Sequence, residues 1–289
     1  MKPYTTLISA AQLQTLLESP QSVRIFDCTS ALMDPLLADT QYAERHIAGA
    51  VQAHLDRDLS AKPPQPAVNG GRHPLPQPEQ LAQWLGRMGF DNQMQAVVYD
   101  RNGANYCGRL WWMLKWLGHE AVAVLDGGLQ AWEAAGGAVA SGPAPQYSLG
   151  RFVPGAPLLP LLQTHEIHER LGQSGQTLID ARAGARYRGE EEPLDPVAGH
   201  IPGALNRPFG QNLTAEGFFK PAPQLRAEFE ALLAGRPPHT VIHHCGSGVS
   251  AVPNLLAMMI AGLGPTGLYA GSWSEWCNTP GMPCATGAE

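Results

Sequence analysis

The sequence is poor in charge and has no long apolar run. Asp, Glu, Lys and Arg make up 15% of its 289 residues, and the formal net charge is −6. Like charges run together only in the three glutamates at 190–192, so neither a nucleic acid nor a charged membrane surface is indicated as a partner. No stretch approaches the roughly 18 apolar residues of a membrane span, and the opening MKPYTTLISAAQL lacks the apolar core of a signal peptide. We therefore expect no nucleic acid, no membrane association and a cytoplasmic location.

Cysteine is also scarce. The five cysteines are odd in number and widely spread, which does not suit a disulfide framework and favours a reducing cytosol; they are Cys28, Cys107, Cys245, Cys277 and Cys284. The hydrophobic content of 44% is that of a soluble globular protein, and the length suits two domains of about 150 residues each.

An internal repeat organises the chain. IFDC followed by YAERHIAGAV, within residues 25–51, corresponds to LIDAR followed by VAGHIPGALN, within residues 178–206. Later in each half, VLDGGLQAW at 124–132 corresponds to GLYAGSWSEW at 267–276. We therefore predict that one fold is used twice, once in each half.

Within each half, short apolar strands alternate with helical segments. This order predicts an α/β fold in which each half is a mainly parallel sheet flanked by helices. Ser9 is a candidate cap for the first helix, with Leu13, Leu16 and Leu17 on its apolar face. The expected strands include VRIFD (23–27), AVVYD (96–100), TLID (177–180) and TVIHH (240–244).

Residues 141–160 are rich in Pro and Gly and lack helical periodicity, as a linker does. We predict an N-terminal domain at 1–140, a linker at 141–157 and a C-terminal domain at 158–289. At the matched strand end the first half carries Asp100 and the second carries Cys245. This difference favours a single active site in the second half, although both positions could also be plain loop entrances.

Cys245 stands between a strand and a helix. The residues from Gly246 to Ser250 form a tight loop, and Pro253 suits the first turn of the helix that follows. Such a loop can direct several backbone N–H groups at an anion, and the helix dipole adds to the effect, so a thiol there is biased toward the thiolate. The alternative is a buried structural cysteine.

These residues resemble a known family. Two half-chains, GHIPGALN, a strand ending in Cys, and GSWSEW are similar to the tandem-domain rhodanese sulfurtransferases, over roughly residues 5 to 285. The Cys-Gly-Ser-Gly-Val-Ser loop resembles that of the 3-mercaptopyruvate sulfurtransferase branch. The thiosulfate branch usually has Arg and Lys directly after the cysteine, where this chain has Gly246 and Ser247.

The resemblance implies covalent catalysis in two displacements. The Cys245 thiolate would take sulfur from 3-mercaptopyruvate to form a persulfide, which a thiol or cyanide would then remove. The acceptor could be a thioredoxin-like protein. Thiosulfate is the alternative donor, and a non-catalytic sulfur carrier is the alternative function. No cofactor or metal is implied.

The resemblance also assigns residues to the site. Ser247, His73 and Asp56 would form a proton relay, as serine, histidine and aspartate do elsewhere. Arg186 would bind the donor's carboxylate, because a guanidinium pairs with a carboxylate through two hydrogen bonds. The persulfide would be held by the backbone of the loop that follows the cysteine, namely Gly246, Ser247, Gly248, Val249 and Ser250.

The chain also departs from the family pattern. A second substrate arginine is expected in a Glu-Pro-Arg segment, but Leu194 stands there, and Arg182 or Arg188 are the candidates to compensate. The usual Asp before Gly-Ser-Trp is Ala270, and Ser250 replaces a commoner Thr.

Two other interpretations are weaker. A tyrosine-type phosphatase needs an Arg at the end of the loop, where this chain has Ala251 and Val252. His243, His244 and Cys245 do not converge on a metal ion, because neighbours on a strand point to opposite faces.

Overall fold

The computed structural model describes residues 2–288, and the chain forms two compact units. Unit 1 contains the residues up to Pro66 together with Pro76–Leu158 and Ala215–Phe218. Unit 2 contains Ala67–Leu75, Leu159–Thr214 and the residues from Phe219 onward. A segment from the first half of the sequence, Ala67–Leu75, thus folds with unit 2. Within the described residues, no helix is both long and apolar enough to cross a membrane.

Unit 1 is built on a five-stranded sheet in which every strand pair is parallel, in the order β1-β6-β5-β2-β4. A separate antiparallel pair, β3 with β7, adds to it. The strands are β1 (Leu7–Ile8), β2 (Val23–Asp27), β3 (His46–Ile47), β4 (Val51–Gln52), β5 (Gln95–Tyr99), β6 (Val122–Leu125) and β7 (Val139–Ala140). The helices are α1 (Ala10–Leu17), α2 (Pro35–Glu44), α3 (Pro78–Arg87), α4 (Cys107–Trp116) and α5 (Gly128–Ala134).

Helices cover the sheet of unit 1 because this packing buries their apolar side chains away from water. Leu13 and Leu16 of α1 pack with Trp132 of α5 in one buried cluster on the sheet. Ser9 caps α1 as predicted, since its hydroxyl accepts the N–H of Gln12. The prediction for Leu17 is wrong: it is 44% exposed, because it is the last residue of α1 and lies off the buried stripe.

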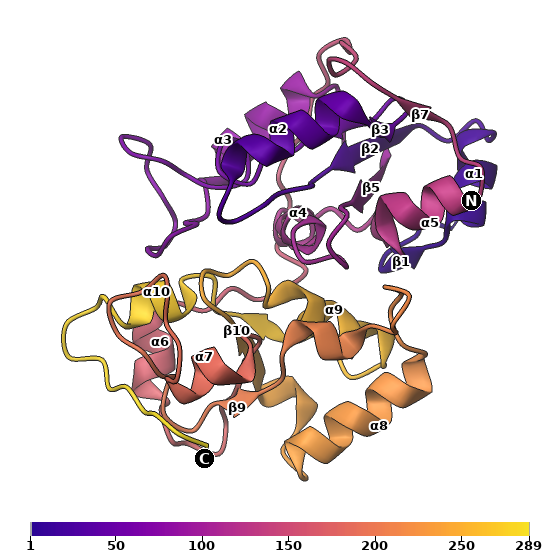
Figure 1. Ribbon diagram of the computed structural model, residues 1–289. Helices are drawn as coiled ribbons and strands as arrows, with labels where there is room; N and C mark the ends of the chain where they lie inside the picture. The colour runs from indigo at the N-terminus through magenta and orange to yellow at the C-terminus, as the bar shows by residue number, and fades with distance from the viewer. Residues whose placement is uncertain (1, 289) are drawn as a thin grey trace. The chain divides into compact units, whose positions relative to one another are not determined.

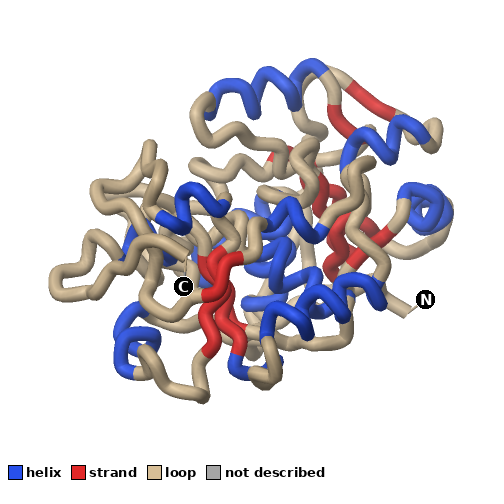
Figure 2. The backbone as a smooth tube through the Cα atoms, turned by 60° about the horizontal axis from the view of Figure 1, so that its bottom comes forward, coloured by secondary structure: helices blue, strands red, loops and turns tan. Residues whose placement is uncertain are grey.

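Unit 2 has a four-stranded parallel sheet in the order β11-β10-β8-β9. Figure 1 shows α6 and α10 on one side of β10 and α9 on the other, and Figure 2 shows the strands of this sheet side by side. The fold class predicted from the alternation of strands and helices is therefore confirmed. The strands are β8 (Thr177–Asp180), β9 (Leu205–Asn206), β10 (Val241–His244) and β11 (Gly267–Leu268). The helices are α6 (Thr164–Glu169), α7 (Gly184–Arg188), α8 (Ala222–Leu233), α9 (Val252–Ile260) and α10 (Ser272–Trp276), with short 3₁₀ turns at Phe209–Asn212 and Pro238–Thr240.

The repeat reappears as the same local structure in both units. His46 stacks on Tyr42 with ring centroids 4.1 Å apart, and its Nδ1 lies 2.7 Å from the Tyr42 carbonyl. His200 stacks on Tyr187 at 3.9 Å, with its Nδ1 2.8 Å from the Tyr187 carbonyl. The paired residues are four positions apart in unit 1 but thirteen apart in unit 2. The segment between Tyr187 and His200 is therefore nine residues longer than the matching segment of unit 1. We call this segment, residues 188–199, the unit 2 insertion.

The loop after β5 shows what this fold does at its strand ends. The Asp100 carboxylate accepts four backbone N–H groups of its own loop at 2.8–3.1 Å, from Asn102, Ala104, Tyr106 and Cys107. Asp100 is only 1% exposed. The loop therefore encloses an anion, and in unit 1 the chain itself supplies that anion.

Replacing Asp100 with Ala should lower the free energy of unfolding by about 3 kcal/mol or more, because several buried N–H groups lose a charged acceptor. The measurement is denaturant unfolding followed by tryptophan fluorescence. Glu18→Ala, at an exposed position of unit 1, is the matched loss of one carboxylate and should change stability by less than about 0.5 kcal/mol. Equal effects of the two substitutions would contradict the prediction.

Candidate active site

Cys245 lies directly after β10, at the edge of the sheet where the parallel strands end. It is 2% exposed. The chain turns through Gly246–Ala251 and enters α9, with Pro253 in the first turn as the sequence predicts. A side chain at this place faces loop backbone and a helix N-terminus, the arrangement that favours a bound anion.

The loop that begins at Cys245 has unused hydrogen-bond donors. In the described part of the chain, the backbone N–H groups of Gly246, Ser247, Val249 and Ser250 donate to no protein acceptor. Buried N–H groups are rarely left in this state. Since the matched loop of unit 1 is filled by the Asp100 carboxylate, the loop in unit 2 is suited to an anion carried on the Cys245 side chain.

Helix α10 holds this loop in place. The Ser272 hydroxyl accepts the Cys245 N–H at 3.1 Å, and the N–H groups of Trp273 and Ser274 donate to the carbonyls of Cys245 and Gly246 at 3.0 and 2.9 Å. Ser272 has a φ of +56°, which is costly for a residue with a β-carbon. Strain of this kind is typical of functional sites, and here it directs the Ser272 hydroxyl at the backbone N–H of Cys245.

Glycine is required at position 248. Its φ is +72°, and a β-carbon there would overlap the carbonyl oxygen of Ala270. The loop therefore packs tightly against the turn that precedes α10, and any larger residue would change its path.

The same helix also positions the Ala67–Leu75 segment. Glu275 accepts the N–H of Gly70 at 2.9 Å, and the Ser274 hydroxyl accepts the N–H of Arg72 at 3.0 Å. These contacts bring His73 against Ser247, with 2.7 Å between Nδ1 and Oγ. Both side chains are buried, at 5% and 7% exposure.

Asp56, the third residue of the predicted relay, lies in unit 1. Its carboxylate pairs with Lys62 at 2.8 Å, and its backbone N–H donates to His54. Its role in the relay stays a prediction.

Two guanidinium groups lie over the start of the loop. A β-carbon built on Gly246 would be 2.8 Å from Nη2 of Arg72 and 3.5 Å from Nη1 of Arg186. Neither candidate for the missing arginine takes this position: Arg182 is held by Asp180, and Arg188 pairs with Glu190 at the surface. The sequence analysis missed Arg72, although its place next to His73 was a usable signal.

Acidic residues of the unit 2 insertion neutralise both arginines. Glu192 pairs with Arg186 at 2.6 Å and lies 3.4 Å from Arg182. Asp195 pairs with Arg72 and lies 3.6 Å from Arg186. From Asp180 to Arg72, positive and negative groups thus alternate through unit 2. The sequence analysis named Leu194 but missed Asp195 beside it.

The other four cysteines are poorly suited to act as nucleophiles. Burial raises the pKa of the Cys28 and Cys107 thiols well above the ordinary value, and it raises that of Cys277 to about 11. Burial also raises the pKa of Cys284. A thiol held protonated reacts slowly, so the loop at Cys245 is the best-placed site for sulfur chemistry.

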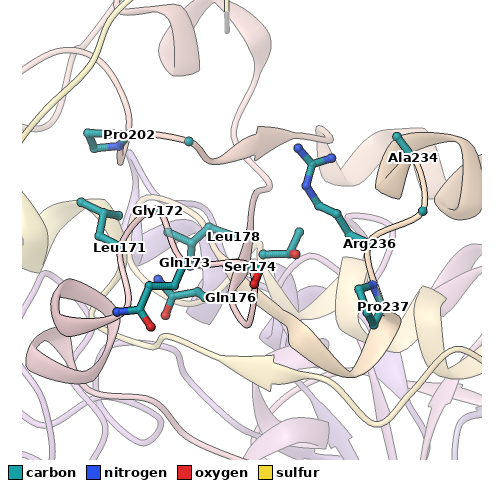
Figure 3. A pocket seen from close by; sticks show the side chains of 13 residues that line it. Leu171, Gly172, Gln173, Ser174, Gln176, Leu178, Pro202, Ala234, Arg236 and Pro237 are labelled. Carbon is teal, nitrogen blue, oxygen red and sulfur yellow. The ribbon is translucent and has the colours of Figure 1, made fainter.

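A hollow of about 530 Å³ elsewhere in unit 2 does not belong to this site. Leu171, Gln176, Pro202 and Arg236 lie around it in Figure 3. It adjoins Thr177, where β8 begins, whereas Cys245 follows the end of the neighbouring parallel strand.

The comparisons with known proteins agree with this geometry. A sequence profile of the Rhodanese-like domain matches residues 9–135 and again residues 163–279. The chain belongs to the rhodanese-like sulfurtransferases. It is 47% identical over 286 residues to the "Probable 3-mercaptopyruvate sulfurtransferase" of Pseudomonas aeruginosa, covering 97% of this chain and 98% of that protein.

Two further relatives share less of the sequence. The thiosulfate sulfurtransferase of Mus musculus is 32% identical over 283 residues, covering 94% of this chain and 92% of that one. The solved structure of SseA, a 3-mercaptopyruvate sulfurtransferase from Escherichia coli, has a TM-score of 0.76 at 30% identity and covers 94% of this chain and all of that one. This rhodanese-like chain thus has two tandem domains of the family's fold, and its relatives use two different donors.

Two buried histidines before Cys245 should make this rhodanese-like protein sensitive to acid. Burial lowers the pKa of His243 to about 3 and that of His244 to about 4, and among the described residues the ring nitrogens of His243 have no hydrogen-bond partner. His244 and Arg207 lower the pKa of His243 further, whereas Asp180 opposes the shift at His244. Because both folded pKa values lie below the unfolded value of about 6.5, stability is fully present above pH 6.5 and falls as the pH drops toward 4.

His243→Leu should flatten this dependence by up to about 1.4 kcal/mol per pH unit between pH 6 and 4, since one fewer proton is taken up on unfolding. The measurement is the free energy of unfolding across that range. The exposed His165, changed to Leu, is the control and should leave the slope unaltered. An unchanged slope in His243→Leu would show that His243 is not buried as a neutral group.

Proposed function

We propose that this protein is a 3-mercaptopyruvate sulfurtransferase in which Cys245 carries the transferred sulfur as a persulfide. One observation carries the proposal: within the described residues, four backbone N–H groups of the loop that begins at Cys245 have no protein acceptor. A persulfide ends in an anionic sulfur, so these donors would stabilise it without moving. The nucleophile then belongs to the predicted C-terminal domain at 158–289, and the N-terminal domain, with Asp100 at the matched place, supplies no nucleophile.

In the first step the Cys245 thiolate attacks the sulfur of 3-mercaptopyruvate, and an S–S bond forms as the donor's C–S bond breaks. The electron pair of that bond passes to the carbon, which leaves as the enolate of pyruvate. The proton of the donor's thiol ends on that carbon, so pyruvate and the Cys245 persulfide anion are the products.

The pair of Ser247 and His73 is suited to moving that proton. The two side chains are 2.7 Å apart and nearly excluded from water, and Ser247 is two residues from the nucleophile. A hydroxyl beside an imidazole can pass a proton from sulfur to carbon with little rearrangement. Asp56 would complete the relay by orienting His73.

The donor's carboxylate would bind Arg186 and Arg72. Both guanidinium groups lie over Gly246, the residue after the nucleophile, which is where a three-carbon donor would place its carboxylate. Arg72 would then supply the second positive charge that Leu194 does not.

In the second step an acceptor thiolate or cyanide attacks the outer sulfur and restores the Cys245 thiolate. A thioredoxin-like protein could supply the thiol. We place the protein in a reducing cytosol, because all five cysteines, which lie in the described part of the chain, are free thiols.

Incubation with 3-mercaptopyruvate should add one sulfur atom, roughly 32 Da, to the protein, as a covalent intermediate requires. Intact mass spectrometry and steady-state assays with 3-mercaptopyruvate and thiosulfate side by side are the measurements. Cys245→Ser should lose both the added mass and turnover, whereas Cys284→Ser, at an exposed thiol, should keep both. An unchanged mass with either donor would favour a non-catalytic binding module, and faster turnover of thiosulfate would reverse the choice of donor.

Arg186→Ala should lower kcat/KM for 3-mercaptopyruvate by about 10- to 100-fold, mainly through KM, because a charged hydrogen bond to the donor is lost. Arg188→Ala removes an arginine from the same helix at the surface and is the matched control. If Arg186→Ala leaves kcat/KM unchanged, the carboxylate binds elsewhere.

A further inference from the structure

Asp195 has an unusual position for a carboxylate in an enzyme that binds an anionic donor. It belongs to the unit 2 insertion, its side chain is 3% exposed, and it pairs with Arg72. Its second oxygen, Oδ2, lies 3.6 Å from Arg186 and accepts no hydrogen bond from any residue that the structure describes. Asp195 thus stands between the two guanidinium groups that a donor's carboxylate would need.

Glu192, the neighbouring acid, is held much more firmly. Its Oε1 accepts the backbone N–H groups of Leu194 and Asp195 at 3.0 and 3.1 Å, in addition to pairing with Arg186. Through these contacts Glu192 holds the backbone of the unit 2 insertion in place. In the described part of the chain the Asp195 carboxylate has no such backbone donors, so Asp195 is the acid that an incoming anion can displace.

There is room beside Asp195 for such an exchange. A hollow of about 350 Å³ adjoins the ion pair and is lined in part by Arg72, Leu194, Asp195 and Ser274. Leu194 offers no charge there. A carboxylate that leaves Arg72 can therefore move toward open space without meeting a second cation from position 194.

We propose that Asp195 is a specificity-determining residue: an internal carboxylate that occupies Arg72 and Arg186 until the donor's own carboxylate displaces it. The proposal rests on the proposed function and deepens it. Asp180, Glu192 and Asp195 balance Arg182, Arg186 and Arg72, so none of the three arginines carries an uncompensated positive charge before the donor binds. A donor with one negative charge replaces Asp195 on the arginines one for one.

Thiosulfate carries two negative charges, one more than the Asp195 carboxylate that it would replace. Its additional charge would lie close to the displaced Asp195 and to Glu192, in a buried site where like charges repel more strongly than in water. Asp195 would therefore select against the dianion, and repulsion of a wrong ligand is a common source of specificity.

The test is Asp195→Asn, which keeps the shape of the side chain and removes its charge. KM for 3-mercaptopyruvate should fall about 3- to 10-fold, and kcat/KM for thiosulfate should rise about 10-fold or more, so the preference between donors narrows. Glu230→Gln removes one charge from the exposed surface of α8 and should change neither value by more than about 2-fold. Asp195→Ser should change KM for 3-mercaptopyruvate and kcat/KM for thiosulfate in the same directions as Asp195→Asn.

A binding measurement separates this proposal from the proposed function. In a Cys245→Ser background, isothermal titration with pyruvate should show several-fold tighter binding when Asp195 is also changed to Asn. Weaker pyruvate binding, or a higher KM for both donors, would overturn the proposal and make Asp195 a residue that only positions Arg72. An equal rise in kcat/KM for both donors would overturn the role of Asp195 in specificity. If no variant turns over either donor, the proposed function fails, while the pyruvate titration still decides whether Asp195 competes with a carboxylate.

Discussion

A tight loop after a buried parallel strand leaves backbone N–H groups without partners, and this constraint governs both halves of the molecule. The hydrogen bonds of the strand end there, the helix that follows has not begun its own, and water is largely excluded. An anion must fill the space. In unit 1 the Asp100 carboxylate does so through four hydrogen bonds, and the site is closed. In unit 2 a cysteine stands at that place, so the donors remain available to the sulfur that Cys245 would carry.

The rest of unit 2 supports this loop through one short helix. Ser272, Trp273 and Ser274 of α10 bind the backbone at Cys245 and Gly246, while Ser274 and Glu275 bind the Ala67–Leu75 segment. The same helix therefore positions both the loop that begins at Cys245 and the segment that carries Arg72 and His73. Positioning of this kind keeps reacting groups within a fraction of an ångström of one another, which catalysis requires.

The charges of the site follow a second constraint. Buried guanidinium groups need partners when no substrate is bound, because an unpaired buried charge is costly. The unit 2 insertion, nine residues longer than the matching segment of unit 1, supplies Glu192 and Asp195 for this purpose. Pairing the arginines internally also makes the donor compete for them, so the same acids that stabilise the empty site would shape its choice of donor.

Local patterns in the sequence were enough to predict the parallel α/β fold, the repeat and a cysteine at a strand end, because strand periodicity, turn residues and helix caps act over a few neighbouring positions. The error at Leu17 arose because periodicity alone does not show where a helix leaves the core. The family resemblance grouped His73 with Ser247, 174 positions away, but only the tertiary structure gives their 2.7 Å contact and places Arg72 beside Asp195, 123 positions away. Such contacts depend on α10 and the insertion folding against the same loop, and no spacing within the chain encodes them. The sequence by itself therefore determined that a cysteine follows a parallel strand and precedes a helix, which made Cys245 the candidate for sulfur chemistry. The tertiary structure decided which charges surround it, because ion pairs form between whichever groups the fold brings within a few ångströms.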